Sequence, residues 1–348
     1  MDGVRIAVVG ATGAVGSVFL RLLEERSFPV RDLKLLASRR SHGKRLKVLG
    51  QEVEVQETVP SVDTFRDVDI AFISAGGEVS RQLAPLAVEA GALVVDDSST
   101  FRMRPEVPLV VPEINAADLE EHRGIVAIPN CSTTQMVMAL WPLHRANPIR
   151  RVVVDTYQSV SGTGAAAVRE LEAQARAVVE GRRPEASVYP HPIAFNLFPH
   201  IDSFLPNGYS KEEWKMVEET RKIMHAPEVA VSATCVRVPV PLCHSEAVHV
   251  EFQRPMAPEE ARELLAAFPG VVVVDEPGQA RYPTPAEAAG RDEVFVGRIR
   301  QDASHPNGLA MWVVSDNLRK GAATNALQIA EEAVRRRVLP AQRALRRG

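Results

Sequence analysis

The first 128 residues alternate between short apolar runs and amphipathic stretches. The runs are rich in Val, Ile, Leu and Ala and have the length of buried β-strands: residues 4–9, 33–37, 69–73, 93–95 and 125–128. Helical spacing of apolar positions follows the first run, at Val18, Leu22 and Leu23, and recurs over residues 83–90. Strands that alternate with helices predict a parallel sheet with right-handed crossovers. We therefore predict a doubly wound α/β domain.

The pattern changes after Pro129. Long β-type runs cover residues 151–157, 230–240 and 247–252, and helical stretches at 165–180 and 211–225 flank a Pro-rich interval at 183–206. This grouping predicts an α+β second domain with an open antiparallel or mixed sheet. Residues 322–338 again show a helical pattern, and we expect this tail helix to pack on the first domain.

Composition narrows the class of protein. A length of 348 residues, at about 100–200 residues per domain, fits two domains. Apolar residues make up 45% and charged residues 24%, which excludes a disordered chain. The 41 basic and 44 acidic residues give a net charge of −3 without a basic stripe, so we expect no nucleic-acid partner.

Three features that would indicate a membrane or secreted protein are not seen in the sequence. No apolar run approaches the length of about 20 residues that crosses a bilayer, so we expect no membrane partner. The first residues carry no secretory signal pattern, and three cysteines cannot form a disulfide framework. We therefore expect a cytoplasmic protein.

Three glycines, Gly10, Gly13 and Gly16, lie between the first predicted strand and helix. A backbone without Cβ atoms can approach a pyrophosphate, and the N–H groups of the first helical turn stabilise its charge. The G-x-x-G-x-x-G spacing departs from the usual G-x-G-x-x-G, and the alternative is a glycine-rich turn without a ligand. Its place at the first strand of the alternating series favours a dinucleotide site.

The residues after the second predicted strand distinguish between the two nicotinamide cofactors. An NAD site usually places an acid here for the ribose hydroxyls, whereas this chain has Ser38, Arg39, Arg40 and Ser41. Guanidinium groups hold a 2′-phosphate that a carboxylate would repel. The loop favours NADP(H), and a solvated basic loop is the alternative.

Cys131 follows a predicted buried strand and is surrounded by Asn130 and three hydroxyl residues that commonly begin helices. A helix N-terminus can lower a thiol pKa from about 8.5 to 3.5–7.5, which makes a nucleophile at neutral pH. The alternative is a small buried hydrophobic residue, which we predict for Cys235; Cys243 stays unassigned. Since no C-x-x-C or H-x-x-x-H spacing is present, we expect no metal site.

A thiol enzyme also needs an acid–base group and residues that hold the substrate. His244 is placed just past a Pro-interrupted strand end, seven residues after Arg237. Such a strand end can direct a side chain into a cleft, so His244 is the candidate acid–base residue.

Seven segments carry a family resemblance that covers almost the whole chain. They are residues 10–16 (GATGAVG), 38–41 (SRRS), 129–133 (PNCST), 158–164 (QSVSGTG), 212–215 (EEWK), 237–241 (RVPVP) with His244, and 315–322 (SDNLRKGA). Together they resemble the aspartate-β-semialdehyde dehydrogenase family, and PNCST and QSVSGTG are the most specific.

The resemblance implies a domain layout and a reaction. It implies a Rossmann NADP-binding domain, residues 1–130, completed by a C-terminal helix in residues 316–348, and a catalytic and dimerisation domain, residues 131–315. The implied reaction is reductive dephosphorylation of L-aspartyl 4-phosphate by NADPH, with phosphate released, in the route to diaminopimelate, lysine, threonine and methionine. A homodimer is implied as well.

The resemblance also implies roles for individual residues. Cys131 is the implied nucleophile and His244 the acid–base group, while Gln158 orients the substrate. The implied substrate contacts are Arg237 on the α-carboxylate, Arg102 and Asn130 on the phosphate, and Glu212 and Lys215 as assisting residues. The implied cofactor contacts are Gly10, Thr12, Gly13, Ala14, Val15, Ser38, Arg40, Ser41, Ser161, Gly162 and Asn317, with a doubt of one residue between Arg39 and Arg40.

The chemistry of an acyl phosphate agrees with these roles. The substrate is negative at both ends, so its site needs two separated cations, which Arg102 and Arg237 provide. Thiolate attack leaves a thioester that accepts a hydride, and we expect N–H groups of the helix that begins near Cys131 to stabilise the oxyanion.

Several alternatives stay open at this point. Another thiol-dependent reductase, such as N-acetylglutamyl-phosphate reductase, would use similar residues, and a non-catalytic dinucleotide sensor would keep the fold. Glu212 and Lys215, three residues apart on a predicted helix, could form an ordinary solvated ion pair. Arg102 could be a surface salt-bridge residue.

Overall fold

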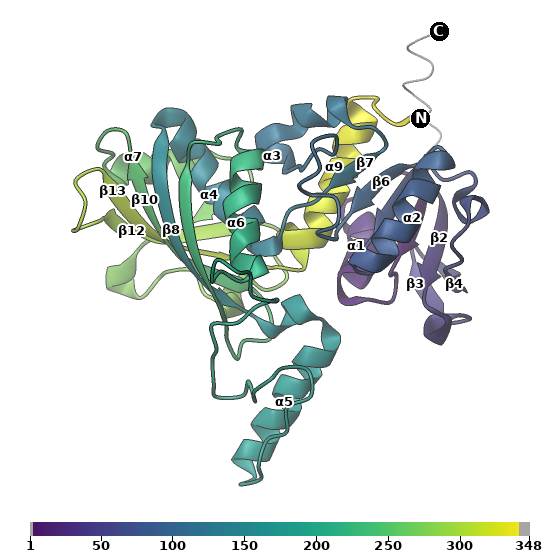
Figure 1. Ribbon diagram of the computed structural model, residues 1–348, viewed down its shortest axis with the longest axis horizontal. Helices are drawn as coiled ribbons and strands as arrows, with labels where there is room; N and C mark the ends of the chain where they lie inside the picture. The colour runs from purple at the N-terminus through teal and green to yellow at the C-terminus, as the bar shows by residue number, and fades with distance from the viewer. Residues whose placement is uncertain (1–2, 341–348) are drawn as a thin grey trace. The chain divides into compact units, whose positions relative to one another are not determined.

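The computed structural model describes residues 3–340, which divide into two compact units. One unit contains the residues up to Pro129 and those from Ala322 onward, and the other contains Asn130–Gly321 (Figure 1). The first boundary lies one residue before the expected one, and the second lies six residues after it.

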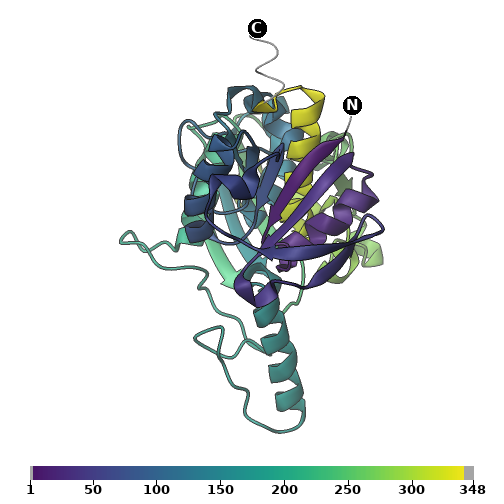
Figure 2. The same ribbon diagram turned by 90° about the vertical axis from the view of Figure 1, so that its right-hand side faces the viewer.

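The first unit is built on a seven-stranded sheet, whose strands lie side by side in Figure 2. Its strands are β1 (Val4–Val9), β2 (Val30–Ala37), β3 (Arg45–Val48), β4 (Gln51–Glu57), β5 (Ile70–Ile73), β6 (Leu93–Asp96) and β7 (Ile125–Ala127). The spatial order is β3-β4-β2-β1-β5-β6-β7, and only the β3–β4 pair is antiparallel. The doubly wound prediction is confirmed.

The strand order reverses at β1. The chain proceeds from β1 to β2 on one side and later reaches β5 on the other. Ligands of such sheets bind outside the carboxyl end of the strand where the order reverses. The glycine turn directly after β1 lies at that point.

Helices cover the sheet of the first unit: α1 (Ala14–Glu25), α2 (Gly77–Glu89), the short α3 (Pro112–Asn115) and α9 (Thr324–Arg335). Phe19 of α1 stacks on Phe72 of β5, with ring centroids 4.3 Å apart. The tail helix α9 packs in this unit, where the Asn325 amide donates to the Val110 carbonyl at 2.8 Å.

The second unit is built on a six-stranded mixed sheet with the order β11-β12-β13-β10-β8-β9. Its strands are β8 (Ile149–Gln158), β9 (Ala230–Arg237), β10 (His244–Phe252), β11 (Val271–Val273), β12 (Val294–Gln301) and β13 (Gly308–Ser315). The β8–β9 and β11–β12 pairs are parallel and the other three are antiparallel. The expected α+β unit with a mixed sheet is therefore observed.

One face of this sheet packs against helices. The helices of the unit are α4 (Cys131–Ala146), α5 (Ala165–Val179), α6 (Lys211–Ile223), α7 (Pro258–Ala266) and the short α8 (Pro285–Ala288). Helix α4 is buried on almost every side, which is why its sequence is apolar around most of its circumference. Helix α6 begins with a capping box between Ser210 and Glu213, and the second Glu213 oxygen accepts the N–H of Cys235 on β9 at 3.0 Å.

The pattern of the sequence missed or misplaced several strands. The predicted strand over residues 230–240 ends at Arg237. His244 follows that strand end as expected, but it is also the first residue of β10, which was predicted to begin at residue 247. Strands β3, β4, β11, β12 and β13 were not identified. Strands β3 and β4 alternate charged and weakly apolar residues at the edge of their sheet, so their pattern resembles that of a loop.

Gly16 allows the turn after β1 to approach the start of α1. A Cβ on Gly16 would lie 2.2 Å from the Gly10 carbonyl oxygen, although Gly16 is inside a helix, where alanine is normally favoured. We expect Gly16→Ala to lower the free energy of unfolding by about 1–3 kcal/mol, because the backbone must move. Thermal unfolding measures this loss.

Gly278→Ala is the matched control, because a Cβ there would meet nothing within 4 Å. It should leave the midpoint nearly unchanged. A midpoint for Gly16→Ala at or above that of the wild type would contradict the account of the turn.

Candidate functional site

Four polar side chains form a row across one end of the second sheet. Strand register pairs Gln158 of β8 with Arg237 of β9, and His244 of β10 with Ser315 of β13. Because Tyr157 pairs with Ser245, Gln158 and His244 are neighbours as well. Directly opposed residues share a face of the sheet, and all four are almost completely buried. We call Arg237, Gln158, His244 and Ser315 the first polar row.

Cys131, at the start of α4, contacts the first polar row. It is the first residue of α4, and its Sγ lies 3.2 Å from Nε2 of His244. The helix begins here because the Asn130 side chain caps it: Oδ1 accepts the N–H groups of Ser132 at 3.0 Å and Thr133 at 3.3 Å. The structure thus brings together Cys131 and His244, which are 113 residues apart in the chain.

The same cap corrects one expectation. We expected N–H groups of this helix to stabilise an oxyanion. The N–H groups of Ser132 and Thr133 instead donate to Asn130, so the expectation is wrong for these two residues. A side chain that begins a helix well also occupies the donors that the helix would otherwise offer.

The surroundings of His244 determine which ring nitrogen carries the proton. The Ser159 N–H donates to Nδ1 at 3.1 Å, so Nδ1 acts as an acceptor. In the neutral ring the proton is therefore on Nε2, where it faces Sγ of Cys131 and stabilises negative charge on the sulfur. Burial, and then the nearby Arg237 guanidinium, lower the pKa of His244 to about 3. The ring is neutral at pH 7.

Asn317 holds the residues that surround the His244 ring in place through hydrogen bonds. Its Oδ1 accepts the Cys243 N–H at 3.0 Å and the hydroxyl groups of Ser159 at 3.1 Å and Ser161 at 3.0 Å. Residues expected at the cofactor, Ser161 and Asn317, thus belong to the hydrogen-bond network that holds His244. Ser159 was not singled out, although it lies within the QSVSGTG segment.

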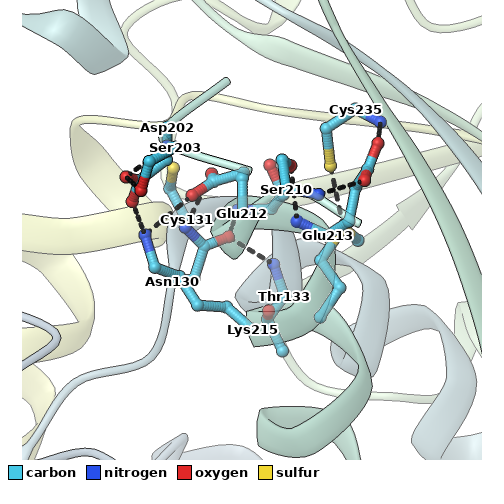
Figure 3. Close-up of polar contacts among 12 residues, drawn as sticks. Asn130, Cys131, Thr133, Asp202, Ser203, Ser210, Glu212, Glu213, Lys215 and Cys235 are labelled. Carbon is cyan, nitrogen blue, oxygen red and sulfur yellow. Dashed lines mark hydrogen bonds and ion pairs between the residues drawn. The ribbon is translucent and has the colours of Figure 1, made fainter. Parts of the chain in front are cut away.

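A buried carboxylate joins the remaining substrate candidates (Figure 3). One Glu212 oxygen accepts from Asn130 Nδ2 at 2.8 Å and from Gln158 Nε2 at 3.0 Å, and the other accepts from Lys215 Nζ at 3.0 Å. Burial alone would raise the pKa of Glu212, but Lys215, Gln158 and Asn130 together lower it to about 2. The group is a carboxylate at neutral pH and is not the solvated ion pair of the alternative interpretation.

Asp202 is a neighbour of this cluster that the sequence did not indicate. Its Oδ2 accepts from Lys215 Nζ at 3.0 Å, opposite Glu212. It lies in the Pro-rich interval, where neither periodicity nor a motif marks it.

Arg237 lies close to Gly162, which also adjoins His244. Its Nη1 donates to the Ser159 carbonyl at 2.6 Å, and the guanidinium lies 5.8 Å from the centre of the Tyr189 ring. A Cβ on Gly162 would come within 3.3 Å of His244 Nε2 and 3.4 Å of Arg237 Nη1. The missing side chain keeps room next to both functional groups.

The glycine turn of the first unit fits a dinucleotide phosphate. Gly10 has φ +86°, and a Cβ there would lie 2.1 Å from the Ser74 carbonyl. Gly13 precedes Ala14 and Val15 at the start of α1, and no side chain caps this helix. Its first N–H groups therefore point to where an anion would bind.

The loop after β2 lies beside this turn. Thr12 and Ser41 are within hydrogen-bond distance through their hydroxyl groups, at 3.1 Å. Arg39 and Arg40 are exposed in a short 3₁₀ turn that follows Ser38. Two exposed guanidinium groups beside a hydroxyl pair fit a 2′-phosphate.

Arg102 belongs to the first unit and is buried. Its Nη2 donates to the Asp97 carbonyl at 2.9 Å, and Asp96, whose pKa burial raises to about 6, is nearby. Arg102 is therefore not the exposed salt-bridge residue of the alternative interpretation.

The other two cysteines differ from Cys131. Cys235 and Cys243 are completely buried, and burial is the main cause that raises the pKa of each thiol. Cys235 packs on α6, with its sulfur 3.7 Å from that of Met216. Cys131, which is partly exposed, is the accessible thiol among the described residues.

Residues 3–340 hold no group of three or more His, Cys, Asp or Glu side chains arranged for a metal ion. Within the same range no helix has the length and apolar character needed to span a bilayer.

Comparison with known proteins identifies the family. A family model described as semialdehyde dehydrogenase, NAD binding domain, matches residues 5–122, and one described as semialdehyde dehydrogenase, dimerisation domain, matches residues 140–320. Aspartate-semialdehyde dehydrogenase of Aquifex aeolicus is 54% identical over 332 residues, which cover 94% of this chain and 97% of that protein.

Solved structures agree with this match. Aspartate semialdehyde dehydrogenase II of Vibrio cholerae, complexed with ASA, is 48% identical with a TM-score of 0.92 over 96% of this chain and 99% of that chain. The Candida albicans enzyme with NADP is 28% identical with a TM-score of 0.73 over 95% and 98% of the two chains. This chain belongs to the aspartate-semialdehyde dehydrogenase family.

Proposed function

We propose that this protein catalyses the NADPH-dependent reductive dephosphorylation of L-aspartyl 4-phosphate to L-aspartate 4-semialdehyde, through a thioester on Cys131. The observation that carries the proposal is the 3.2 Å contact between Cys131 Sγ and His244 Nε2 at the start of α4. Arg237 and Gln158 continue the same row of side chains. A dinucleotide sensor requires none of these groups.

Cys131 begins the reaction as a thiolate that the His244 Nε2–H stabilises. Its sulfur attacks the acyl carbon, a C–S bond forms, and the bond from that carbon to the phosphate oxygen breaks. Phosphate leaves with the electron pair and takes up one proton, so a thioester remains on the enzyme.

NADPH, when bound, supplies a hydride to the thioester carbon. The tetrahedral species then collapses, its C–S bond breaks, and the aldehyde leaves. Negative charge returns to the Cys131 sulfur, next to the proton on His244 Nε2. His244 is therefore the group placed to hold or move a proton at the sulfur.

The residues that recognise the substrate follow from its charges. Arg237 pairs with the α-carboxylate, and the anionic Glu212 favours the α-ammonium group, with Lys215 beside it. Gln158 is held in one orientation, because Oε1 accepts from Thr156 at 3.0 Å while Nε2 donates to Glu212. Arg102 and Asn130 are assigned to the phosphate.

NADP(H) is the proposed cofactor of the first unit. The N–H groups of Ala14 and Val15 would hold the pyrophosphate, and Thr12 and Ser41 would contact the adenosine half. Arg40 would hold the 2′-phosphate. The NADP bound to the related Candida albicans enzyme supports NADP(H) as the cofactor.

The proposal includes assembly and location. A homodimer formed through the second unit is supported by the dimerisation-domain match over residues 140–320. The face of the sheet opposite α4 carries Tyr157, 38% exposed, whose ring lies 5.4 Å from that of Trp312. A biosynthetic reaction on charged metabolites is consistent with the cytoplasm.

The reverse reaction tests the proposed function directly. L-aspartate 4-semialdehyde should reduce NADP beyond one equivalent per active site only when phosphate or arsenate is present to release the acyl group. A clear preference for N-acetylglutamate 5-semialdehyde would indicate the other reductase, and no activity with either aldehyde would overturn the proposal.

Removal of the nucleophile should stop turnover. We expect Cys131→Ala to lower kcat by at least about 1,000-fold, while the dissociation constant of NADPH, measured by its fluorescence, stays within about twofold. Cys235→Ala is the matched control, because that thiol is buried in the packing of α6 on β9 and should retain most of the activity. More than a tenth of the wild-type rate in Cys131→Ala would mean that another residue is the nucleophile.

The roles of Arg39 and Arg40 can be distinguished by comparing NADPH with NADH, which lacks the 2′-phosphate. Loss of one charged phosphate contact costs about 1.5–3 kcal/mol, or roughly 10-fold to 100-fold in affinity. We expect Arg40→Ala to raise KM for NADPH by about that factor and KM for NADH by less than twofold. Arg39→Ala is the matched control; a larger selective effect there would transfer the role to Arg39, and equal losses for both cofactors would contradict a 2′-phosphate contact.

A further inference from the structure

A second polar row lies directly behind the first one. The register aligns Cys235 of β9 with Thr156 of β8, Thr156 with Glu246 of β10, and Glu246 with Val313 of β13. These residues are each two positions from the first row and share its face of the sheet. The next row, which contains Val154 and Val248, is apolar.

Glu246 is the unexplained member of this second row. It is completely buried, and neither carboxyl oxygen has a hydrogen-bond partner within 3.5 Å. The same is true of both amide atoms of Gln135 on α4, which is 1% exposed. The polar group that faces the Glu246 carboxyl is this Gln135 amide. Burying the Glu246 carboxyl and the Gln135 amide without partners would lower the free energy of unfolding, unless the two groups form hydrogen bonds with each other.

The two groups repeat the spacing of the thiol and the imidazole. Gln135 is one turn beyond Cys131 on α4, a rise of about 6 Å. Glu246 is two residues beyond His244 on β10, a rise of about 7 Å. The helix and the strand are thus connected at two successive levels, Cys131 with His244 and Gln135 with Glu246.

We propose that Glu246 is a positioning residue: its neutral carboxylic acid pairs with the Gln135 amide and so holds the first turns of α4 with Cys131 against His244. In this pairing the acid O–H would donate to Gln135 Oε1 and the acid's carbonyl oxygen would accept from Nε2, which requires the two groups to approach more closely than they do in the structure. Glu246 touches neither substrate nor cofactor in this proposal, which rests on the assignment of Cys131 as the nucleophile.

The charge state follows from the surroundings of Glu246. Burial raises the pKa of Glu246 well above its usual value, and the Gln135 amide opposes this effect only in part. The titratable neighbour along the row is the Cys235 thiol, whose pKa is also raised, first by burial. Ionisation of Glu246 would place a carboxylate against Gln135 Oε1 in an apolar region, so the acid form is the stable one.

Alkylation of Cys131 by iodoacetamide tests the positioning role without substrate or cofactor. Cys235 and Cys243 are completely buried, so the reaction in the folded protein reports on Cys131. Glu246→Leu leaves the Gln135 amide unpaired and should slow alkylation at pH 7 by about tenfold or more, whereas Glu246→Gln, which can pair with an amide, should stay within about threefold of the wild type. Glu251→Gln, near the opposite end of the same strand, where Glu251 is partly exposed and pairs with Arg151, is the matched control and should not change the rate.

The pH dependence of unfolding tests the neutral acid and does not require Glu246→Leu to fold. An acid whose pKa is raised in the folded state binds more protons there than in the unfolded chain, so its stability contribution declines as pH rises above about 4.5. Glutamine cannot ionise. The unfolding midpoint of Glu246→Gln relative to the wild type should therefore increase by about 3 °C or more between pH 5 and pH 8.

Two results would overturn the proposal. One is alkylation of a folded Glu246→Leu at the wild-type rate, and the other is a midpoint difference for Glu246→Gln that does not change with pH. Failure of the proposed function would appear separately, as a wild-type protein that reacts normally with iodoacetamide but does not oxidise the semialdehyde.

Discussion

The contact between the Cys131 sulfur and the His244 imidazole is the interaction on which the rest of the site depends. It requires that α4 begin at residue 131, that β10 begin at residue 244, and that the two elements pack with these ends together. The Ser159 N–H makes Nδ1 an acceptor and so directs the ring proton to the sulfur. The N–H of Ser159, directly after strand β8, thus determines which nitrogen of His244 faces the Cys131 thiol with a proton.

On the face of the second sheet that packs against α4, the buried polar side chains lie at one end. The first row holds the residues assigned to chemistry, and the second holds Thr156 and Glu246, which face the first row and α4. Behind them the sheet is apolar. Buried charge is tolerated there because each group has a specific partner: Glu212 is stabilised by Lys215 and two amides. The fold therefore concentrates its electrostatic cost where the reaction occurs.

Local features of the sequence predicted the local structure well. The glycine turn after β1 and the cap before Cys131 depend on residues within a few positions of each other, so the sequence reveals them. Strands β3 and β4, at the edge of the first sheet, are rich in charged residues. Their pattern therefore resembles that of a loop, and the sequence does not predict them as strands. Contacts of Ser159, Asp202 and Glu246 with the site depend on strand register and on partners far away in the chain, which periodicity cannot reveal. The expectation that helix N–H groups stabilise an oxyanion was wrong for Ser132 and Thr133, because it considered the helix without its cap.

The central claim is that Cys131 carries the acyl group, and trapping that group tests it most directly. The protein is mixed with NADP and L-aspartate 4-semialdehyde without phosphate, then quenched with acid and analysed by peptide mass spectrometry. One equivalent of NADPH and an aspartyl adduct on the peptide that contains Cys131 are the predicted result. An adduct on another residue, or a burst of NADPH without any thiol adduct, would contradict it.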